Sequence, residues 1–290
     1  MSFRIVIITK RSILSYKDNY LVIRSDENEM IHLSEIHTLI VQSTMVTLTS
    51  YLISELMKRR IKVIICDEFA NPVCELAPYY WGYNSPKRIL KQINWSEEAK
   101  KTAWTEIIKE KILRQAEHLK ELGLKEYKLL MKYYNEVQFD DETNREGHAA
   151  KVYFNALFGK EFSREIYNRI NAGLNYGYTV ILSAFNREIA SRGYLTQIGI
   201  HHCNEFNQFN LSSDLMEPFR VIVDRFVYKN QNRNLDSDYK ISLTDILNTK
   251  VKYLNKEYYL VNAITLYVQN VINYIEEGKI IKGMYSVYEV

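Results

Sequence analysis

The fold is decided by residues 96–122, which read SEEAKKTAWTEIIKEKILRQAEHLKEL. Ser96 and the two glutamates after it are typical of a helix start, because serine caps the first amides and acidic groups suit the positive helix end. Apolar residues then recur at helical spacing from Trp104 to Leu113. We therefore predict a long helix that ends just before Gly123.

The residues before this helix have the character of strands. Short apolar and β-branched runs are separated by polar segments, and residues 17–19 (KDN) suit the turn of a hairpin. One helical pattern interrupts the strands, with Leu48, Leu52 and Leu56 on one face. We predict a small β-rich domain with one helix in residues 1–76.

The residues after Gly123 keep the helical period. We predict helices over residues 125–135, over 171–192, and after Asp140 and Asp141, whose carboxylates could cap a helix that runs to Leu157. The last ninety residues also have a helical pattern.

Residues 77–95 separate the two patterns. Up to Pro86 they hold two prolines and no helical period, so we interpret this range as an interdomain linker. The predicted fold class is α+β. A small N-terminal β-rich domain with one helix (1–76) precedes a larger all-α catalytic domain that binds DNA (96–290).

The composition excludes several classes of protein. Hydrophobic residues make up 47% and charged residues 25%, which are ordinary values for a soluble globular protein. The three cysteines form no Cys-x-x-Cys pair, which argues against a disulfide framework and a cysteine zinc site. No signal peptide or membrane-span pattern is present, so we expect a cytoplasmic protein without membrane contact. The phosphate-loop, dinucleotide and serine-hydrolase motifs are also missing.

The positive charge is concentrated in one region. Residues 86–132 hold twelve Lys or Arg against seven Glu and no Asp, although the whole chain carries only +3. Such a region can bind the phosphate backbone of duplex DNA. On charge alone, a solvated helical face with mixed charges is the more frequent explanation.

Two stretches are unlike a protein core. Glu146 lies beside the apolar stripe of its helix, where a carboxylate needs a partner. That partner is either a structural arginine or lysine, or a divalent cation. In residues 201–220, His202, Asp214 and Glu217 could bind Mg²⁺ or Mn²⁺, and Ser213 could cap a helix that carries both carboxylates. From spacing alone this signal is weak.

Four ordered stretches carry a resemblance to a known family. They are residues 146–153 (EGHAAKVY), 171–178 (NAGLNYGY), 199–202 (GIHH) and 214–220 (DLMEPFR). They resemble the Glu-Gly-x-Ala-Ala-Arg-x-Tyr, Asn-x-x-Leu-Asn-Tyr-Gly-Tyr, Gly-x-x-His and Asp-Leu-Met-Glu-x-Phe-Arg-Pro patterns of the CRISPR-associated spacer-integration endonuclease. This family is the larger member of the universal adaptation pair, and the resemblance covers the whole chain. The amino-acid sequences at residues 207–210 and 216–219 are similar to those of the type II-A branch.

The resemblance implies a metal centre. The family's metal ligands, which are also its catalytic residues, fall on Glu146, His202 and Glu217, with Mg²⁺ or Mn²⁺ as the cofactor. The family gap of two residues between glycine and histidine selects His202 over His201. Asp214 matches a further acidic position near the metal.

Four more side chains are candidates for contact with DNA phosphate. They are Arg145, Lys151, Tyr178 and Arg220, and structural pairing around the carboxylates explains them equally well. Lys151 stands where the family usually has arginine, which keeps the charge but loses bidentate phosphate contact. Val221 replaces the usual proline, which affects the turn more than the chemistry.

The implied function is the insertion of short foreign DNA fragments into a CRISPR repeat array. A DNA 3′-hydroxyl would attack a phosphodiester of the repeat, which is a transesterification. The implied partners are double-stranded DNA, a second copy of the chain and a small ferredoxin-like adaptation protein. The type II-A effector nuclease and a ring-shaped DNA-end-binding protein would also take part. The N-terminal domain is the candidate surface for the homodimer.

Three other functions remain open. A metal-dependent nuclease that acts on branched or single-stranded DNA would use the same residues. A non-catalytic DNA-binding scaffold would keep them as structural pairs. An RNA-binding helical module, stacking bases on some of the 23 tyrosines, is the remote alternative, because no known RNA-binding motif is present.

Overall fold

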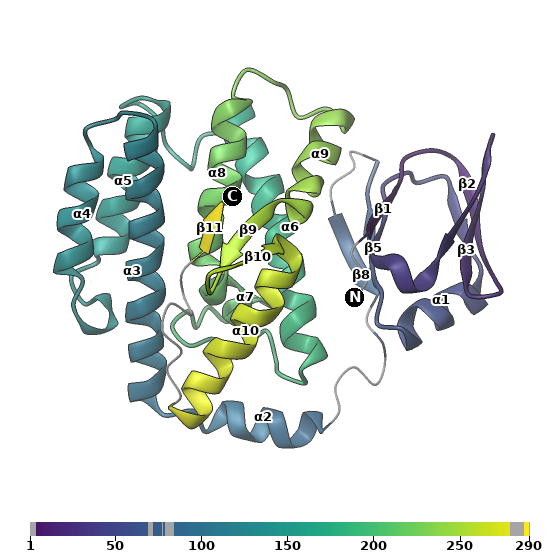
Figure 1. Cartoon of the computed structure of the whole chain (residues 1–290), viewed down its shortest axis with the longest axis horizontal. Helices are drawn as coiled ribbons and strands as arrows, with labels where there is room; N and C mark the ends of the chain where they lie inside the picture. Colours follow the sequence, from purple (N-terminus) through teal and green to yellow (C-terminus); the bar gives the residue numbers. More distant parts are fainter. Residues whose placement is uncertain (1–3, 69–71, 77, 79–83, 279–286, 290) are drawn as a thin grey trace. The chain divides into compact units, whose positions relative to one another are not determined.

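The computed structural model describes residues 4–68, 72–76, 78, 84–278 and 287–289. The chain forms two compact units, Met1–Tyr83 (unit 1) and Asn84–Val290 (unit 2), as Figure 1 shows. Unit 1 consists of strands and one α-helix, and unit 2 is larger and mainly helical. The predicted α+β fold class is therefore confirmed.

Unit 1 contains two four-stranded sheets. Its elements are β1 (Arg4–Ile8), β2 (Ser12–Lys17), β3 (Tyr20–Arg24), β4 (Asn28–His32), η1 (Leu33–Glu35), β5 (Ile36–Val41), β6 (Val46–Leu48), α1 (Ser50–Lys58), β7 (Lys62–Cys66) and β8 (Pro72–Leu76). One sheet has the order β1-β5-β7-β8, in which β5 is parallel to both neighbours. The other has the order β4-β3-β2-β6, and the predicted hairpin joins β2 to β3. Asp18 and Asn19 take the positive φ angles that a tight hairpin turn needs.

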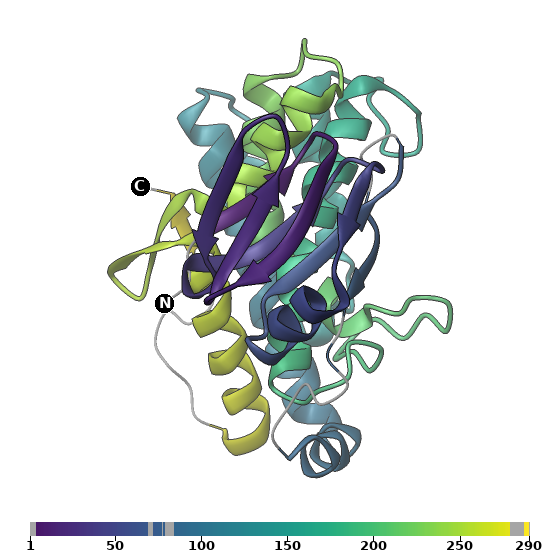
Figure 2. The same ribbon diagram turned by 90° about the vertical axis from the view of Figure 1, so that its right-hand side faces the viewer.

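The core of unit 1 lies between the two sheets. Leu14, Leu21 and Leu39 come from both sheets and are fully buried in one apolar cluster that includes α1. Figure 2 faces this unit and shows the β2–β3 hairpin of the second sheet in front of the first sheet. Leu48 was predicted on the helix but ends β6, because Thr49 caps α1 by accepting a hydrogen bond from the Leu52 amide.

Unit 2 contains the helices that the sequence predicts, with additions. Its elements are α2 (Ser85–Ile93), α3 (Glu97–Glu121), α4 (Tyr127–Glu136), η2 (Phe139–Asp141), α5 (Arg145–Phe158), α6 (Arg169–Ser191), α7 (Asn210–Leu215), η3 (Glu217–Phe219), α8 (Arg220–Lys229), α9 (Ser237–Thr244), η4 (Asp245–Asn248), β9 (Lys250–Tyr253), β10 (Lys256–Tyr259), α10 (Leu260–Glu277) and β11 (Val287–Glu289). Helix α3 begins after Ser96, whose side chain accepts a hydrogen bond from the Ala99 amide, as predicted. No helix in the described part of the chain is both long and apolar enough to cross a membrane.

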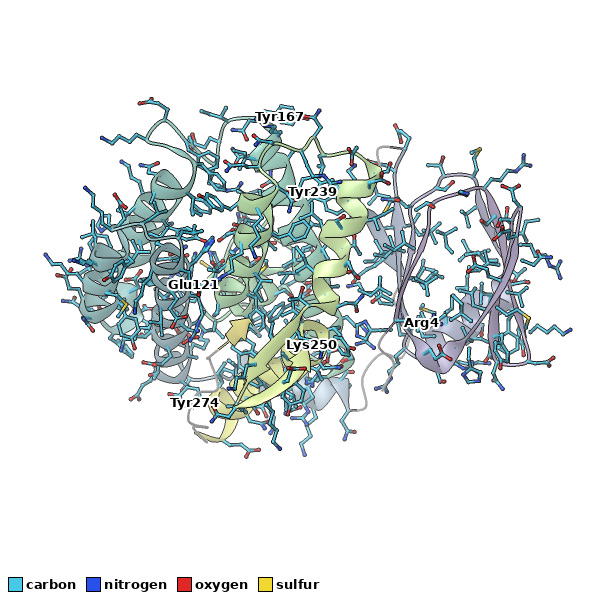
Figure 3. All side chains as sticks on the ribbon, turned by 45° about the horizontal axis from the view of Figure 1, so that its top comes forward. Arg4, Glu121, Tyr167, Tyr239, Lys250 and Tyr274 are labelled. Atoms are coloured by element: carbon cyan, nitrogen blue, oxygen red, sulfur yellow. The ribbon has the colours of Figure 1, made fainter. Side chains whose placement is uncertain are left out.

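Two boundaries differ from the prediction. The range 77–95 is not a plain linker, because α2 occupies Ser85–Ile93 and Pro86 sits in its first turn, where a missing amide costs nothing. Residues 77 and 79–83 of that range lie outside the described residues. Unit 2 is also not all-α, since β9, β10 and β11 form a small sheet. Lys250, labelled in Figure 3, pairs with Glu257 across its hairpin at 2.8 Å.

Helices α6 and α8 approach each other closely in unit 2. A Cβ atom added to Gly177 of α6 would lie 2.4 Å from Cγ1 of Val223 on α8, well inside van der Waals contact. The glycine therefore sets the spacing of the two helices. The next residue, Tyr178, is thereby brought within hydrogen-bond reach of Asp224 on α8.

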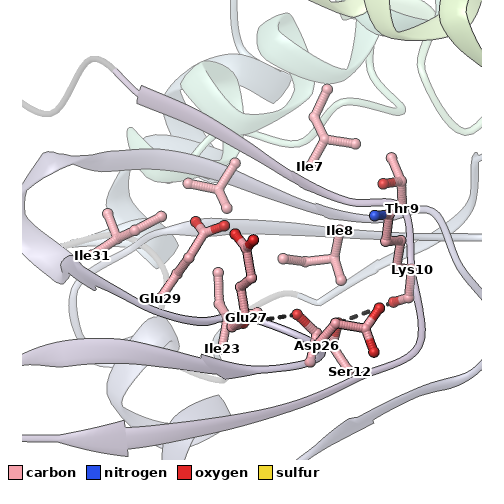
Figure 4. A pocket seen from close by; sticks show the side chains of 12 residues that line it. Ile7, Ile8, Thr9, Lys10, Ser12, Ile23, Asp26, Glu27, Glu29 and Ile31 are labelled. Atoms are coloured by element: carbon pink, nitrogen blue, oxygen red, sulfur yellow. Dashed lines mark hydrogen bonds between the residues drawn. The ribbon is translucent and has the colours of Figure 1, made fainter.

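Unit 1 carries an open hollow of about 530 Å³ beside β1, drawn in Figure 4. Its lining includes Ile8 and Ile23 as well as the carboxylates of Asp26, Glu27 and Glu29. None of the described residues that line it carries an imidazole. Its chemistry therefore differs from that of the histidine-containing region of unit 2.

Candidate active site

The predicted ligands come from three separate elements of unit 2. Glu146 lies in the first turn of α5, Glu217 begins η3, and His202 lies in the loop before α7. The start of α5 is held firmly: the Asp141 carboxylate accepts hydrogen bonds from the amides of Arg145 and Glu146, at 2.8 and 3.0 Å. Asn144 is the N-cap proper, so the predicted cap at Asp140 and Asp141 is shifted, with Asp141 adding a second cap.

A lysine joins the two glutamates. The Lys111 ammonium on α3 lies 2.5 Å from Oε1 of Glu146 and 2.6 Å from Oε2 of Glu217. Arg220 donates from Nε to the other Glu217 oxygen at 2.8 Å. Two carboxylates that are 71 residues apart in the sequence thus share one cation position.

Lys111 and Glu217 are both charged at neutral pH. Burial alone would lower the pKa of Lys111, but attraction to Glu146 and Glu217 outweighs it and raises the pKa above its ordinary value. Burial alone would raise the pKa of Glu217, but Arg220 and Lys111 lower it to about 2. The site is therefore a network of buried ions that compensate one another.

Asp214 organises the turn that carries the histidines. Its side chain is fully buried and accepts hydrogen bonds from the amides of Ile200, His201 and His202, at 2.7 to 3.1 Å. Gly199 makes this approach possible, because an added Cβ would lie 2.7 Å from Oδ2 of Asp214 and 2.4 Å from the His202 carbonyl oxygen. The Gly-x-x-His motif thus has a steric cause.

The two histidines have different surroundings. His202 donates from Nδ1 to Oδ1 of Asp214 at 2.5 Å, which leaves the Nε2 lone pair for a ligand. This hydrogen bond, together with the charges of Asp214, Glu217 and Glu146, raises the pKa of His202 despite its partial burial. His201 instead stacks on Trp104, with ring centroids 4.2 Å apart. The electrostatic coupling to both glutamates agrees with the choice of His202 as the ligand candidate.

Asp214 and Glu217 do not share one helix face. Helix α7 begins at Asn210, so Ser213 lies inside it and is not its cap. Glu217 then starts the separate turn η3. The short helix turns Asp214 toward the histidine turn, whereas Glu217 faces Lys111 on α3.

The four candidates for phosphate contact are placed differently. Arg220 lies at the site, on Glu217, with its guanidinium 4.7 Å from the centre of the Tyr178 ring. The Tyr178 hydroxyl donates to Asp224, so contact with a phosphate would require that bond to break. Arg145 pairs with Glu136 at 3.1 Å, and Lys151 is exposed on α5. Arg220 is thus the candidate nearest the ligands.

The basic excess of residues 86–132 is partly neutralised by internal ion pairs. The basic residues of α3 form the pairs Lys100–Glu97, Lys101–Asp140, Lys109–Glu106, Lys111 with both site glutamates, and Arg114 with Glu110 and Glu117. A DNA-backbone surface on this helix therefore stays a prediction.

The donor set fits a hard divalent cation. Two carboxylates face one cation position, and His202 is near enough for their charges to raise its pKa; carboxylates with an imidazole are a mixture suited to Mg²⁺ or Mn²⁺. In the described part of the chain no three such groups converge as a complete metal cage. An open hollow of about 600 Å³ is lined in part by His201 and His202.

Lys111 is the residue that the sequence analysis missed. It continues the inward stripe of Ile107 and Ile108 on α3, so it is a charged residue at an apolar position. The same reasoning that marked Glu146 as needing a partner marks Lys111 as well. The periodicity of α3 therefore marks Lys111 as a charge that needs a partner, but it does not say which residue that partner is.

Comparison with known sequences identifies relatives. A family model described as "CRISPR associated protein Cas1" matches residues 5–252. A CRISPR-associated endonuclease Cas1 from Neisseria meningitidis serogroup C is 35% identical over 226 residues, which cover 77% of this chain and 74% of the relative. A second Cas1 endonuclease, from Francisella tularensis subsp. novicida, is 28% identical over 48% of this chain and 47% of that protein.

Comparison with solved structures finds the same fold. A casposase bound to integration product superposes with a TM-score of 0.77 at 19% identity, over 98% of this chain and 94% of that one. A Cas1 protein from Thermotoga maritima superposes with a TM-score of 0.58 at 18% identity, over 96% and 97% of the two chains. The family match and the Neisseria relative together show that this chain belongs to the Cas1 family of CRISPR-associated proteins.

Proposed function

We propose that this protein is a metal-dependent DNA endonuclease and integrase, which inserts short DNA fragments into a CRISPR repeat array. The observation that supports the proposal is the shared cation position of Glu146 and Glu217 beside His202. The Neisseria relative is named an endonuclease, and the casposase is bound to an integration product. Both names agree with phosphodiester chemistry at such a site.

Glu146, Glu217 and Nε2 of His202 would hold Mg²⁺ or Mn²⁺. When bound, the ion supplies Lewis-acid stabilisation of the phosphoryl oxygens. In the transesterification, the 3′-hydroxyl of the fragment loses its proton as its oxygen bonds to phosphorus, the bond from phosphorus to the 3′-oxygen of the cut strand breaks, and that leaving oxygen takes up a proton. Asp214 fixes the direction of the His202 ring. Arg220 provides positive charge close to the reacting phosphate.

The assembly is part of the proposal. Two of the structural neighbours are Cas6-RT-Cas1–Cas2 complexes, which agrees with a small ferredoxin-like partner for this chain. We further propose a homodimer formed through unit 1 and binding to double-stranded DNA. The type II-A branch, with its effector nuclease and ring-shaped DNA-end-binding protein, rests on the sequence resemblance alone. A cytoplasmic location also stays a proposal.

A strand-transfer assay tests the proposal. The purified chain and its small partner are incubated with a labelled short duplex with free 3′-hydroxyls and a plasmid that carries a leader and one repeat. Mn²⁺ or Mg²⁺ is compared with EDTA, and wild type with His202→Ala. His148→Ala is the matched control, because this histidine is exposed on α5, two residues from Glu146.

Label at the leader–repeat junction, lost with EDTA and with His202→Ala but kept with His148→Ala, would support the integrase. Nicked plasmid without joined label would favour the nuclease on branched or single-stranded DNA. Label that survives EDTA and His202→Ala would refute the metal centre. If Glu146→Ala binds DNA as well as wild type and gives the same plasmid products, the non-catalytic DNA-binding scaffold would be favoured.

A further inference from the structure

Lys111 has an unusual place among the basic residues of α3. Its side chain is only 10% exposed, and both carboxylates that it contacts are candidate metal ligands. By contrast Lys109, which precedes Lys111 by two residues on the same helix, is 32% exposed. Its ammonium lies 3.4 Å from the carboxylate of Glu106. Lys111 therefore belongs to the site and not to the outer surface.

We propose that Lys111 is the resident counter-ion of the metal site, which a divalent cation must displace from the two glutamates in order to bind. The inference rests on the proposed metal-dependent function and adds a residue to it. Lys111 would hold Glu146 and Glu217 together in the metal-free protein and would set the affinity for the ion.

The distances support mutual exclusion. The ammonium lies 2.5 and 2.6 Å from one oxygen of each glutamate. Mg²⁺ binds carboxylate oxygens at about 2.1 Å, so an ion shared by the same two oxygens would overlap the ammonium. Arg220 is hydrogen-bonded to Oε1 of Glu217, and Lys111 contacts Oε2. If Lys111 withdraws, Oε2 becomes the Glu217 oxygen that can bind the ion.

The side-chain chemistry fits displacement. Lysine is a point charge on a flexible stem, so its ammonium can withdraw without disturbing the helix, whereas an arginine fork would hold both carboxylates more rigidly. Without any cation, two ionised carboxylates at one buried position would repel each other. The lysine thus keeps the ligands assembled until the ion arrives.

Metal affinity separates this role from a purely structural one. If Lys111 competes with the ion, Lys111→Met should bind Mn²⁺ more tightly, by roughly tenfold for the loss of one strong buried contact. Its metal-free Tm should fall, and the rise in Tm on adding Mn²⁺ should exceed that of wild type. Lys109→Met, which removes the same charge from the same helix, should match wild type in both measurements.

Calorimetric titration with Mn²⁺ alone, without DNA, supplies the affinity. An unchanged or weaker Kd in Lys111→Met, with wild type binding normally, overturns the inference and leaves the proposed function standing. If neither wild type nor the variant binds Mn²⁺, the metal-dependent function itself fails and the inference fails with it.

A measurement on wild type covers the case in which Lys111→Met does not fold. The ¹⁵Nζ resonance of Lys111 should shift when Mg²⁺ is added, because its two partners change. Lys62 is the internal reference, since it is buried in unit 1 and paired with Glu75 at 2.8 Å. A Lys111 signal that stays fixed while the His202 ring signals move would overturn the inference.

Discussion

The two units bury different kinds of side chain. The core of unit 1 is apolar, with Leu14, Leu21 and Leu39 between its sheets. Unit 2 buries Lys111, Asp214, Glu217 and Asp224 within its helices. Buried ions contribute little net stability compared with apolar residues of similar volume, so a fold gains little from them. Unit 1 also buries the charged side chains of Glu55 and Lys62, each of them in an ion pair. The difference between the units is that the buried charges of unit 2 include a candidate metal ligand, Glu217, and its partner Lys111.

The largest effect on stability should come from unit 1. Leu39→Ala should cost roughly 2–5 kcal/mol, because the fully buried side chain leaves a cavity between the sheets. Amide hydrogen exchange of β1, β5 and β7 would report the loss. Ile13→Ala on β2, which is 50% exposed, is the control and should cost much less. Equal costs at the two positions would contradict an apolar core confined between the sheets.

The next effect lies in unit 2 and concerns metal affinity. Asp214→Asn should weaken Mn²⁺ binding by about 10–100-fold, the usual range when a residue that orients a metal ligand is changed. The amide group cannot accept all the hydrogen bonds from the turn and from His202. Calorimetry measures the change, with the exposed Asp238→Asn as reference. Unaltered affinity would show that Asp214 does not orient the histidine.

A smaller effect concerns pH. Burial, with the nearby positive charge of Arg225, lowers the pKa of His118 to about 4. Below about pH 6.5 the unfolded chain protonates this histidine, whereas the native protein keeps it neutral down to about pH 4. The free energy of unfolding therefore decreases as the pH falls from about 6.5 toward 4, and the loss reaches about 2 kcal/mol at pH 5. His118→Gln should remove this slope, measured by urea unfolding at pH 7 and pH 5.

Asp224 makes an opposite contribution to the same pH range. Burial raises its pKa to about 6, so the native protein holds this proton more tightly than the unfolded chain does and loses stability as pH rises through 4 to 6. Asp224 is present in both His118→Gln and wild type, so the difference between their pH profiles reports the contribution of His118 alone. Parallel pH profiles for the two proteins would contradict the assignment.

The smallest effect should come from an exposed ion pair of unit 1. Arg4, labelled in Figure 3, pairs with Glu35 at 2.9 Å, and the two side chains are 51% and 42% exposed. Their coupling should be below about 1 kcal/mol, because solvent screens the charges. A double-mutant cycle of Arg4→Ala and Glu35→Ala measures it. A larger coupling would mean that unit 1 also depends on its charges.

Local signals in the sequence predicted most of the elements. Ser96 and Gly123 mark the ends of α3 because capping is a short-range interaction. The helix α2 was missed because its short sequence was grouped with the preceding stretch, which holds Pro78 and has no helical period, although Pro86 suits a first turn. The hairpin at Lys250–Tyr259 was missed because its strands are short and carry charged residues.

The site could be predicted only in part. The motifs selected Glu146, His202 and Glu217, of which Glu146 and Glu217 contact the same Lys111 ammonium, while the three as a metal site stay a prediction. Their partners depend on long-range packing. The contact of Lys111 with both glutamates needs α3, α5 and η3 to be placed in three dimensions, which helix periodicity does not provide.

The four hydrogen bonds of Asp214 have a consequence for how the protein matures. The turn at residues 199–202 has no regular structure of its own and takes its shape from a carboxylate on α7. The direction of the His202 ring therefore depends on the packing of α7 against this turn. A chain whose helices have formed but whose α7 has not yet packed would leave the His202 ring without a fixed direction, so under the proposed function it would bind no metal ion in the working geometry.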